Sequence, residues 1–438
     1  MSTSVIAQLL NGENIDLNSK VQSRYRRLGI RYNPFPKSGT ANVLGNSLQD
    51  SKLVPVDEPV LEQVSRYVID SLYAQGQQDD DKFLSAVIVG DYGSGKTQLL
   101  MYVKYLLSNA SSYKELYKNP YVIYLDNPGV RLSELIGGIV SKIGEENFKK
   151  YLWNKIISGL KKLYDAGEKF RKFKPDAGFD LFGGEKDLFA EKHIVNYKSF
   201  LSNWISILGS IKQRQDFNSV LKAEIISILK SDFKDGIVSD YLYDLIANDY
   251  ASGTIWESFS TGDAKRLEKK YVEIISAIVQ LVKDQGYTDF FILVDEFEDI
   301  TQGRLSKSQV DNYLYNLRTL IDHQRQWCLM FAMTGVALEK LRKVSPPLAD
   351  RIGGRRINIP SLDTEKAKVL VNNYLDMATD SEISAQELFT DSGIAYILKY
   401  SSYITRNFLR HCFEILERLA DDPEAKQVDE NFSSIHLN

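Results

Sequence analysis

Residues suited to phosphate chemistry lie together in one short stretch, residues 86–100. The segment reads Ala-Val-Ile-Val-Gly-Asp-Tyr-Gly-Ser-Gly-Lys-Thr-Gln-Leu-Leu: a short apolar strand, a glycine-rich turn and the first turn of a helix. Gly90, Gly95, Lys96 and Thr97 fit G-x-x-x-x-G-K-[ST] at every position. Glycines let the backbone curl so that N–H groups point at phosphate oxygens, and the helix start adds its positive dipole end. We therefore predict a nucleoside triphosphate site formed by Gly90, Asp91, Tyr92, Gly93, Ser94, Gly95, Lys96, Thr97 and Gln98.

A second acidic element follows an apolar strand much later in the chain. Residues 290–300 read Phe-Phe-Ile-Leu-Val-Asp-Glu-Phe-Glu-Asp-Ile. We expect Asp295 to hold Mg²⁺ through its water shell together with the Thr97 hydroxyl, and Glu296 to polarise the attacking water. An acidic residue at the end of a buried strand is by itself weak evidence for a nucleotide site. Together with the phosphate loop it becomes strong evidence. Lys96 would reach the β- and γ-phosphates.

Three further residues are candidates for contact with the γ-phosphate. Thr334 ends an apolar strand over residues 327–333 and could bind the phosphate or the attacking water; it could equally be an ordinary strand-end threonine. Arg351 lies with Arg355 and Arg356 before a last short strand, where an arginine could stabilise the transferring phosphoryl group. Arg406, near the start of a late helix, could reach the nucleotide or be a surface arginine.

Composition limits the remaining possibilities. The 438 residues are 43% hydrophobic and 26% charged, with a net charge of −4, so any nucleic-acid site must be a local patch. No apolar run is long enough to span a membrane, and the first residues lack a signal-peptide pattern. The two cysteines exclude a disulfide scaffold and suit a cytoplasmic location, and the scattered histidines make a structural metal unlikely.

The order of elements predicts an α/β fold: a parallel, doubly wound core with a large all-helical insertion and a C-terminal helical lid. Strands are expected over residues 86–90, 121–125, 290–295 and 327–333, and only helical periodicity over 145–286. Three helices are expected after Leu362, followed by a short polar tail. The predicted divisions are a leader (1–56), the first part of the core (57–145), the insertion (146–286), the second part of the core (287–361), and the lid with its tail (362–438).

The front of the insertion, Lys149–Lys174, is basic. It holds nine lysines and arginines against two acidic residues, with five aromatic residues between them. Cations on phosphates and aromatic rings for base stacking would make it a DNA-binding patch. The alternative is a helix pair with a solvated basic face and a buried aromatic face, or a contact to an acidic partner.

The leader has two open interpretations. Arg24, Arg26, Arg27 and Arg31 precede the extended Pro-containing segment that ends in Asn33-Pro-Phe-Pro36. It could be strapped to the core by Tyr32 and Phe35, or it could cover the nucleotide base.

Taken together, these motifs resemble the AAA+ ATPases. The leader and the Val294–Ile300 segment look most like the initiator-type (origin-recognition-like) and transposition-regulator branch; residues 28–36, 86–145 and 288–420 carry the resemblance. The resemblance implies that Thr334 is the first sensor, Arg406 the second and Arg351 a trans-acting arginine finger. Two features depart from the family: Ile404-Thr405 replaces the usual Gly-x-Pro-type turn, and the winged-helix domain of initiators has no counterpart.

The predicted function is therefore that of an ATP- and Mg²⁺-dependent ATPase switch. It would assemble into homo-oligomers, with ATP bridging neighbouring subunits, and regulate a DNA-associated complex. The alternative is a signalling or scaffold NTPase, such as a defence-system module, whose insertion recognises a partner protein and not DNA. A structural protein or a compact metabolic kinase fits the motifs less well.

Overall fold

The computed structural model describes residues 24–39, 58–73, 85–109, 118–167, 170, 173, 189, 191–248, 251–300, 305–322, 327–379 and 388–437. Residues 77–82, an acidic loop by sequence, and the loop at 174–184 within the insertion both lie outside these residues. The chain divides into two compact units, residues 1–66, 88–102 and 357–438 forming the first, and residues 67–87 and 103–356 the second.

Five strands form one parallel sheet in the order β2-β3-β4-β1-β5. Their bounds are β1 Ser85–Val89, β2 Pro120–Leu125, β3 Asp289–Val294, β4 Cys328–Met333 and β5 Arg356–Asn358. Pairing of β2 with β3 sets Leu125 beside Val294, and pairing of β3 with β4 sets Val294 beside Phe331. Every residue of β3 and β4 is buried. Such continuous apolar runs are typical of strands covered on both faces. The predicted α/β class and the predicted strands are confirmed.

Helices of the second unit continue this alternation. They are α4 Lys96–Ser108, which starts in the first unit, then α5 Leu132–Ile143, α12 Lys307–Asp322, α13 Gly335–Val344 and α14 Pro346–Gly353. The helix α3, Glu58–Tyr73, also runs from one unit into the other. Among the described residues no helix is long and apolar enough to cross a membrane.

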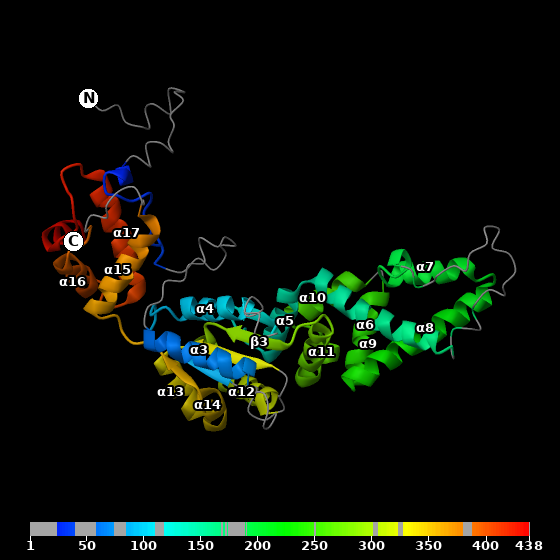
Figure 1. The fold of residues 1–438 in the computed structure, drawn as a ribbon. Coiled ribbons are helices and arrows are strands. Elements are labelled where there is room, and N and C mark those ends of the chain that lie inside the picture. The colour runs from blue at the N-terminus through cyan, green and yellow to red at the C-terminus, as the bar shows by residue number, and fades with distance from the viewer. Residues whose placement is uncertain are drawn as a thin grey trace. The chain divides into compact units, whose positions relative to one another are not determined.

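Residues 145–283 are helical wherever the structure describes regular elements, as predicted. The helices are α6 Glu145–Asp165, η4 Glu191–His193, α7 Tyr197–Ile207, α8 Ile211–Phe233, α9 Gly236–Ala247, α10 Ser252–Thr261, η5 Lys265–Leu267 and α11 Tyr271–Lys283. In Figure 1, α5, α10 and α11 lie close to β3, whereas α7 and α8 lie farther away. Close packing joins α10 to α5, because a Cβ on Gly137 would stand only 2.6 Å from the Gly262 nitrogen.

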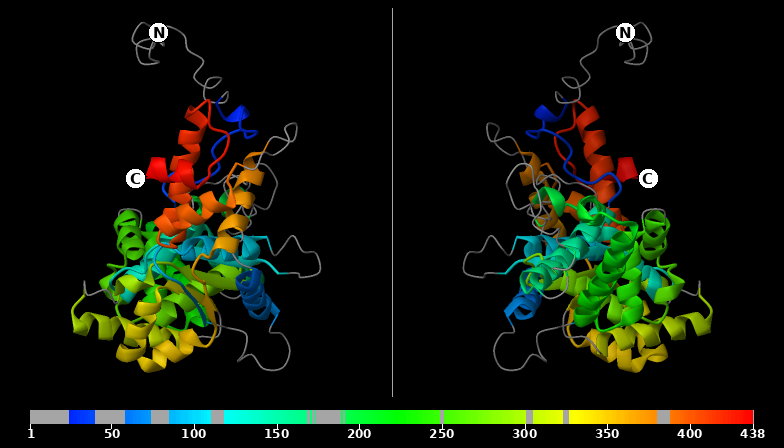
Figure 2. Two further views of the ribbon diagram at one scale, coloured as in Figure 1. Left: turned by 90° about the vertical axis from the view of Figure 1, so that its left-hand side faces the viewer. Right: turned by 90° about the vertical axis from the view of Figure 1, so that its right-hand side faces the viewer.

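The first unit contains the C-terminal helices α15 Thr364–Ala378, α16 Asp391–Tyr400, α17 Thr405–Asp421 and α18 Glu430–Leu437. Apolar residues recur along α17 at helical spacing, and between Phe408 and Leu419 all of them are buried except the half-buried Phe413. Leader residues complete this core: Tyr25, Leu28, Ile30 and Phe35 share one apolar cluster with it. Figure 2 shows the leader (blue) beside α17 (red).

The prediction of a polar tail after Asp422 was wrong. Residues 430–437 form α18, in which Ser433 and Leu437 are buried. The preceding segment makes a parallel bridge from Val428 to Phe389, and a Cβ on Gly393 would collide with the Val428 backbone. Tertiary contacts therefore fix this helix, whose short and polar sequence carries little periodicity of its own.

Candidate nucleotide-binding site

The phosphate loop joins β1 to α4 within the first unit. Gly93 and Gly95 have φ values of +75° and +99°, which residues with a side chain adopt only under strain. A Cβ on Gly93 would approach Ile404 Cγ2 to 2.9 Å and Arg406 Cβ to 3.0 Å. At Gly95 the nearest atom would be Gln98 Oε1 at 3.8 Å, so there the backbone angle, not crowding, calls for glycine. The loop therefore has the curled backbone that the sequence predicted.

Lys96 is the first residue of α4, and its side chain folds back into the loop. The residue is 8% exposed, and its ammonium donates to the carbonyl oxygens of Gly90 and Asp91, both at 3.2 Å. Ser94 lies in the same curl, and its buried Oγ has no hydrogen-bond partner. A buried cation, an unsatisfied hydroxyl and a helix N-terminus are features that suit a bound phosphate group.

The lid helix α17 contacts the phosphate loop directly. The backbone N–H of Arg406 donates to the carbonyl oxygen of Gly93 at 3.0 Å. Its guanidinium lies 4.9 Å from the ring centroid of Tyr92, which is 70% exposed. Such a cation–π contact is worth about 0.5–1 kcal/mol at an exposed site. Arg406, predicted to reach the nucleotide from the lid, thus lies beside the phosphate loop.

The turn that precedes α17 does without glycine and proline. Ser402 and Tyr403 have φ values of +54° and +60°. The turn is closed by backbone hydrogen bonds, among them Tyr403 N–H to Leu398 O at 3.1 Å. Two consecutive non-glycine residues in the left-handed region of backbone conformation cost free energy, which the surrounding packing must offset. Although this turn lacks the glycine and proline of a Gly-x-Pro-type turn, Arg406 still contacts the phosphate loop.

The leader is strapped to the C-terminal helices. Phe35 is 3% exposed and packs on Tyr374 and Phe389, whereas Tyr32 is 46% exposed. Of the two predicted anchors, Phe35 is buried and Tyr32 is not. The described leader ends at Gly39, where a Cβ would collide with the Arg406 carbonyl oxygen. These contacts support the strap; a role in covering the base stays a prediction.

Two leader arginines are used in this attachment. Arg24 pairs with Glu417 at 2.8 Å and with Asp421 at 3.0 Å. Arg27 donates to carbonyl oxygens at the end of α17, including that of Asp422. Burial alone would raise the pKa of Glu417, but hydrogen bonds from Tyr25, Asn33 and Arg24 outweigh it and hold the pKa below its ordinary value. The same carboxylate and burial raise the pKa of Tyr25.

In the second unit, the acidic pair stands at the carboxyl end of β3. Asp295 is 3% exposed; its carboxylate accepts from the Tyr124 hydroxyl at 3.0 Å and from the Glu296 N–H at 2.9 Å. Burial and the Asp295 charge raise the pKa of Tyr124 far above its ordinary value, so this hydroxyl stays a donor. The sequence analysis missed Tyr124, although a tyrosine near the end of an apolar strand is a signal that could have been used.

Glu296 has an unusual backbone. Its side chain is exposed and its φ is +49°, in the left-handed region that is costly for a residue with a long side chain. Glu296 is thus exposed, whereas Asp295 beside it in the chain is buried. The sequence predicted different roles for the two acids, with Asp295 holding magnesium and Glu296 polarising the attacking water. These roles stay predictions.

Thr334 and Arg351 each have a structural partner. The Thr334 Oγ1 accepts from Ala337 N–H at 3.2 Å and so caps α13, which leaves its own O–H available as a donor. Arg351 pairs with Asp322 and donates to the Pro347 carbonyl at 2.9 Å. Arg355 pairs with Asp70 at 2.6 Å. Their roles at the γ-phosphate stay predictions.

The basic segment buries most of its described aromatic rings. Trp153, Phe170 and Phe173 are buried, and the Trp153 Nε1 donates to the Ile194 carbonyl at 2.6 Å. Tyr164 packs against Phe189 and Trp204. The three buried rings are not available for base stacking, which corrects the DNA-binding hypothesis for them, whereas Tyr151 and Tyr164 are partly exposed. Lys155 is also engaged, pairing with Asp232 and Asp284 at 2.5 and 2.6 Å, whereas Lys150, Lys161 and Lys162 are exposed.

The cations Lys169, Arg171, Lys172 and Lys174 of this segment lie outside the described residues. For metal binding, the described residues hold no cluster of three or more histidine, cysteine, aspartate or glutamate side chains.

Of the comparisons with known proteins, only the one with solved structures found matches. No family model and no curated protein matches the chain. The ORC2 protein of Aeropyrum pernix, in its ADPNP–ADP complexes, matches with 12% identity and a TM-score of 0.44, covering 92% of this chain and 71% of that one. The ORC1 protein of the same organism in complex with DNA matches with 11% identity and a TM-score of 0.41, covering 88% and 67%.

Proposed function

We propose that this chain is an ATPase switch of the AAA+ type, binding ATP at the loop Gly90–Gln98 and coupling its state to the helical lid. The observation that carries this proposal is the hydrogen bond from Arg406 N–H to Gly93 O. It fixes the lid helix to the loop whose shape a triphosphate would set. A change in the loop on binding or losing phosphate would therefore act on α17 directly.

Each of the two nucleotide motifs follows the carboxyl end of a strand of the sheet. β1, β4 and β3 are consecutive in the sheet, and the phosphate loop, Thr334 and Asp295 each follow the carboxyl end of one of them. Ligands of open α/β sheets bind at these ends. We propose that Lys96 neutralises the β- and γ-phosphates, that Thr334 donates its hydroxyl to the γ-phosphate or the attacking water, and that Glu296 orients that water.

In the hydrolytic step, the water oxygen forms a bond to the γ-phosphorus while the bond from that phosphorus to the bridging β–γ oxygen breaks. Glu296 accepts the proton of the water, and ADP leaves with the electron pair. Magnesium, when bound, would neutralise the developing charge on the phosphates. Thr97 would hold this ion through its hydroxyl and Asp295 through the ion's water shell, and the hydroxyl of Tyr124 and the N–H of Glu296 hold the Asp295 carboxylate in place.

Assembly into oligomers remains part of the proposal. An arginine such as Arg351 could complete the site of a neighbouring subunit, because its side chain is 38% exposed. It would have to leave Asp322 to do so. An exposed ion pair contributes at most about 1 kcal/mol, so a phosphate can compete for this arginine.

Regulation of a DNA-associated complex is the preferred role, and recognition of a partner protein by the insertion is the alternative. The buried rings of Trp153, Phe170 and Phe173 reduce the stacking surface of the basic segment, so DNA would be held there mainly by charge. A helical insertion that recognises a protein fits this arrangement equally well. The double variant Lys161→Glu/Lys162→Glu separates the two roles. Both side chains are exposed, so we expect the variant to fold.

The test of nucleotide binding is a titration of a fluorescent ATP analogue into the wild-type chain and into Lys96→Ala. We expect saturable binding by the wild type and a loss of at least tenfold in affinity for Lys96→Ala. Equal affinity in the two proteins would refute a phosphate-loop site. For the client, loss of salt-sensitive duplex binding in the Lys161/Lys162 variant supports DNA, and unchanged binding supports the protein-recognition role.

A further inference from the structure

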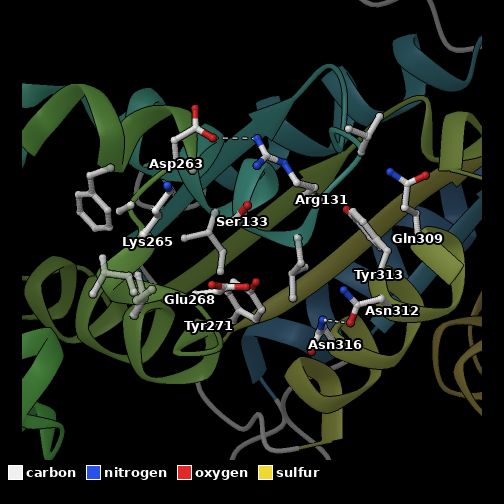
Figure 3. Close-up of a pocket in the computed structure, with 18 residues that line it drawn as sticks. Arg131, Ser133, Asp263, Lys265, Glu268, Tyr271, Gln309, Asn312, Tyr313 and Asn316 are labelled. Carbon is white, nitrogen blue, oxygen red and sulfur yellow. Dashed lines mark hydrogen bonds and ion pairs between the residues drawn. The ribbon is translucent and has the colours of Figure 1, made fainter. Parts of the chain in front are cut away.

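A pocket of about 560 Å³ lies within the second unit, between the start of α5, the η5–α11 region and α12 (Figure 3). Its volume is within the range of small ligand-binding sites. None of the residues assigned to the nucleotide lines it. The pocket thus stands apart from the ATP chemistry, although it belongs to the junction between the core and the helical insertion.

One wall presents a row of carboxamides. Gln309, Asn312 and Asn316 are three and four residues apart on α12, so they lie on one face of that helix. Asn316 Nδ2 donates to Asn312 Oδ1 at 3.0 Å. This pairing leaves the Asn312 amide N–H groups and the Asn316 carbonyl oxygen to face a ligand. Exchanging O and N in both side chains leaves the same result, one donor group and one acceptor group.

The opposite wall carries charges of both signs. Lys265 and Glu268 are exposed on the η5 side, and Arg131 is held between Glu134 and Asp263 at 2.7 and 2.9 Å. Two cations and two acids therefore line the pocket, with buried apolar side chains such as Leu132 and Ile274 between the walls. A phosphate-rich ligand would need an excess of unpaired cations, which the lining does not provide.

We propose that this pocket binds an extended peptide segment of a partner protein. A free main-chain peptide unit offers one N–H and one C=O, which is the complement of the Asn312–Asn316 pair. Lys265 and Glu268 can pair with an acidic and a basic side chain of the same segment, and the apolar floor can take a side chain that points inward. Peptide binding in this pocket does not depend on nucleotide binding.

The pocket wall also touches the acidic element. Tyr313 lines the pocket, its hydroxyl donates to the Pro128 carbonyl at 3.1 Å, and its ring packs edge-on against Phe297 at a centroid distance of 6.4 Å. Phe297 directly follows Glu296 in the chain. A peptide seated against Tyr313 is therefore next to the residues that support the exposed acid.

The test uses a displayed library of random 12-residue peptides, selected on the full chain and counter-selected on an Asn312→Leu/Asn316→Leu variant. A synthetic peptide with the selected consensus is then titrated by fluorescence anisotropy. We expect its affinity to fall about tenfold or more in Asn312→Leu, because a buried ligand amide loses its partners. The matched control is Gln215→Leu, which removes an exposed carboxamide from α8 and should leave the affinity unchanged.

Two outcomes would overturn the proposal. One is a selection that yields no peptide whose binding depends on Asn312 and Asn316, while circular dichroism shows both variants folded. The other is evidence that the pocket binds nucleotide. In that case a fluorescent ATP analogue would still bind the Lys96→Ala variant, and this binding would be lost in the double variant Lys96→Ala/Asn312→Leu. Because peptide binding is measured without ATP and can be repeated in Lys96→Ala, a failed nucleotide site would leave the expected peptide result unchanged.

Discussion

The backbone N–H of Arg406 donates to the carbonyl oxygen of Gly93 at 3.0 Å, so the first turn of the lid helix is bonded to the phosphate loop. The contact is between main-chain atoms, and it holds whichever way the Arg406 side chain points. That side chain rests on the exposed ring of Tyr92. Loop, lid and leader thus meet at one residue, because Gly39 also abuts the Arg406 carbonyl.

Replacing Gly93 with alanine should disturb this meeting point. The φ of +75° and the approach of a Cβ to Ile404 and Arg406 both oppose a side chain, and the cost should be about 1–3 kcal/mol of stability. We expect ATP affinity to fall about tenfold or more. The control is Gly253→Ala in α10, where a Cβ meets nothing within 4 Å and should stabilise the helix by about 0.5–1 kcal/mol. Unchanged nucleotide affinity in Gly93→Ala would count against the loop–lid contact.

Glu296→Gln should separate binding from hydrolysis. The amide keeps the shape of the side chain but cannot accept a proton, so turnover should fall at least about 100-fold while the dissociation constant for ATP changes little. The measurements are phosphate release and analogue titration. Asp126→Asn is the matched control, since Asp126 is an exposed acid at the end of neighbouring β2. Comparable losses in both variants would show that Glu296 has no special role.

Phe35→Ala should destabilise the first unit through the leader. Phe35 is buried among the C-terminal helices, and removing such a ring typically costs about 3–5 kcal/mol. Tyr32→Ala is the control, because that residue is largely exposed, and it should cost much less. The measurement is urea unfolding of each variant. Similar midpoints for Phe35→Ala and wild type would contradict the strap.

Stability of the first unit should decline between neutral and mildly acidic pH because of His411. Burial, together with the charge of Arg410, lowers the pKa of His411 below its ordinary value of 6.5, although Glu414 opposes this. Its Nδ1 lies 2.9 Å from the Ser401 hydroxyl, and its ring packs on Tyr400. The unfolded chain therefore binds a proton more readily than the folded one.

The stability that the neutral His411 contributes is fully present above the pKa of this histidine in the unfolded chain. It is lost as the pH falls through the lower pKa of His411 in the folded chain. Urea unfolding at pH 7.5 and 5.5 measures the decline, and His411→Gln should reduce it. An identical decline in wild type and His411→Gln would rule out this histidine as its cause.

The sequence predicted the elements whose signals are local. The run Phe290–Val294 and the glycine pattern around Lys96 determine a strand end and a loop without help from distant residues. Helix α18 could not be predicted in this way, since its position depends on Val428 meeting Phe389 and Gly393. The burial of Trp153 also depends on partners far along the chain, such as Ile194, and periodicity does not tell a buried ring from one available to DNA.

The peptide pocket illustrates the same limit. Asn312 and Asn316 read as ordinary polar residues of an amphipathic helix, and Lys265 and Glu268 as surface charges about fifty residues earlier. Only the fold brings the two groups to face each other. Conversely, the sequence placed Arg406 near the nucleotide by resemblance, and the structure supplies the contact with Gly93 that makes this possible.

The most direct test of the proposed function is ATP turnover measured against protein concentration, with Lys96→Ala as the inactive control. We predict that the wild-type rate per chain rises with concentration, because a neighbouring subunit completes the site, and that Lys96→Ala shows no turnover. Turnover that survives in Lys96→Ala, or a wild-type chain that neither binds nor hydrolyses ATP, would contradict the account of the phosphate loop.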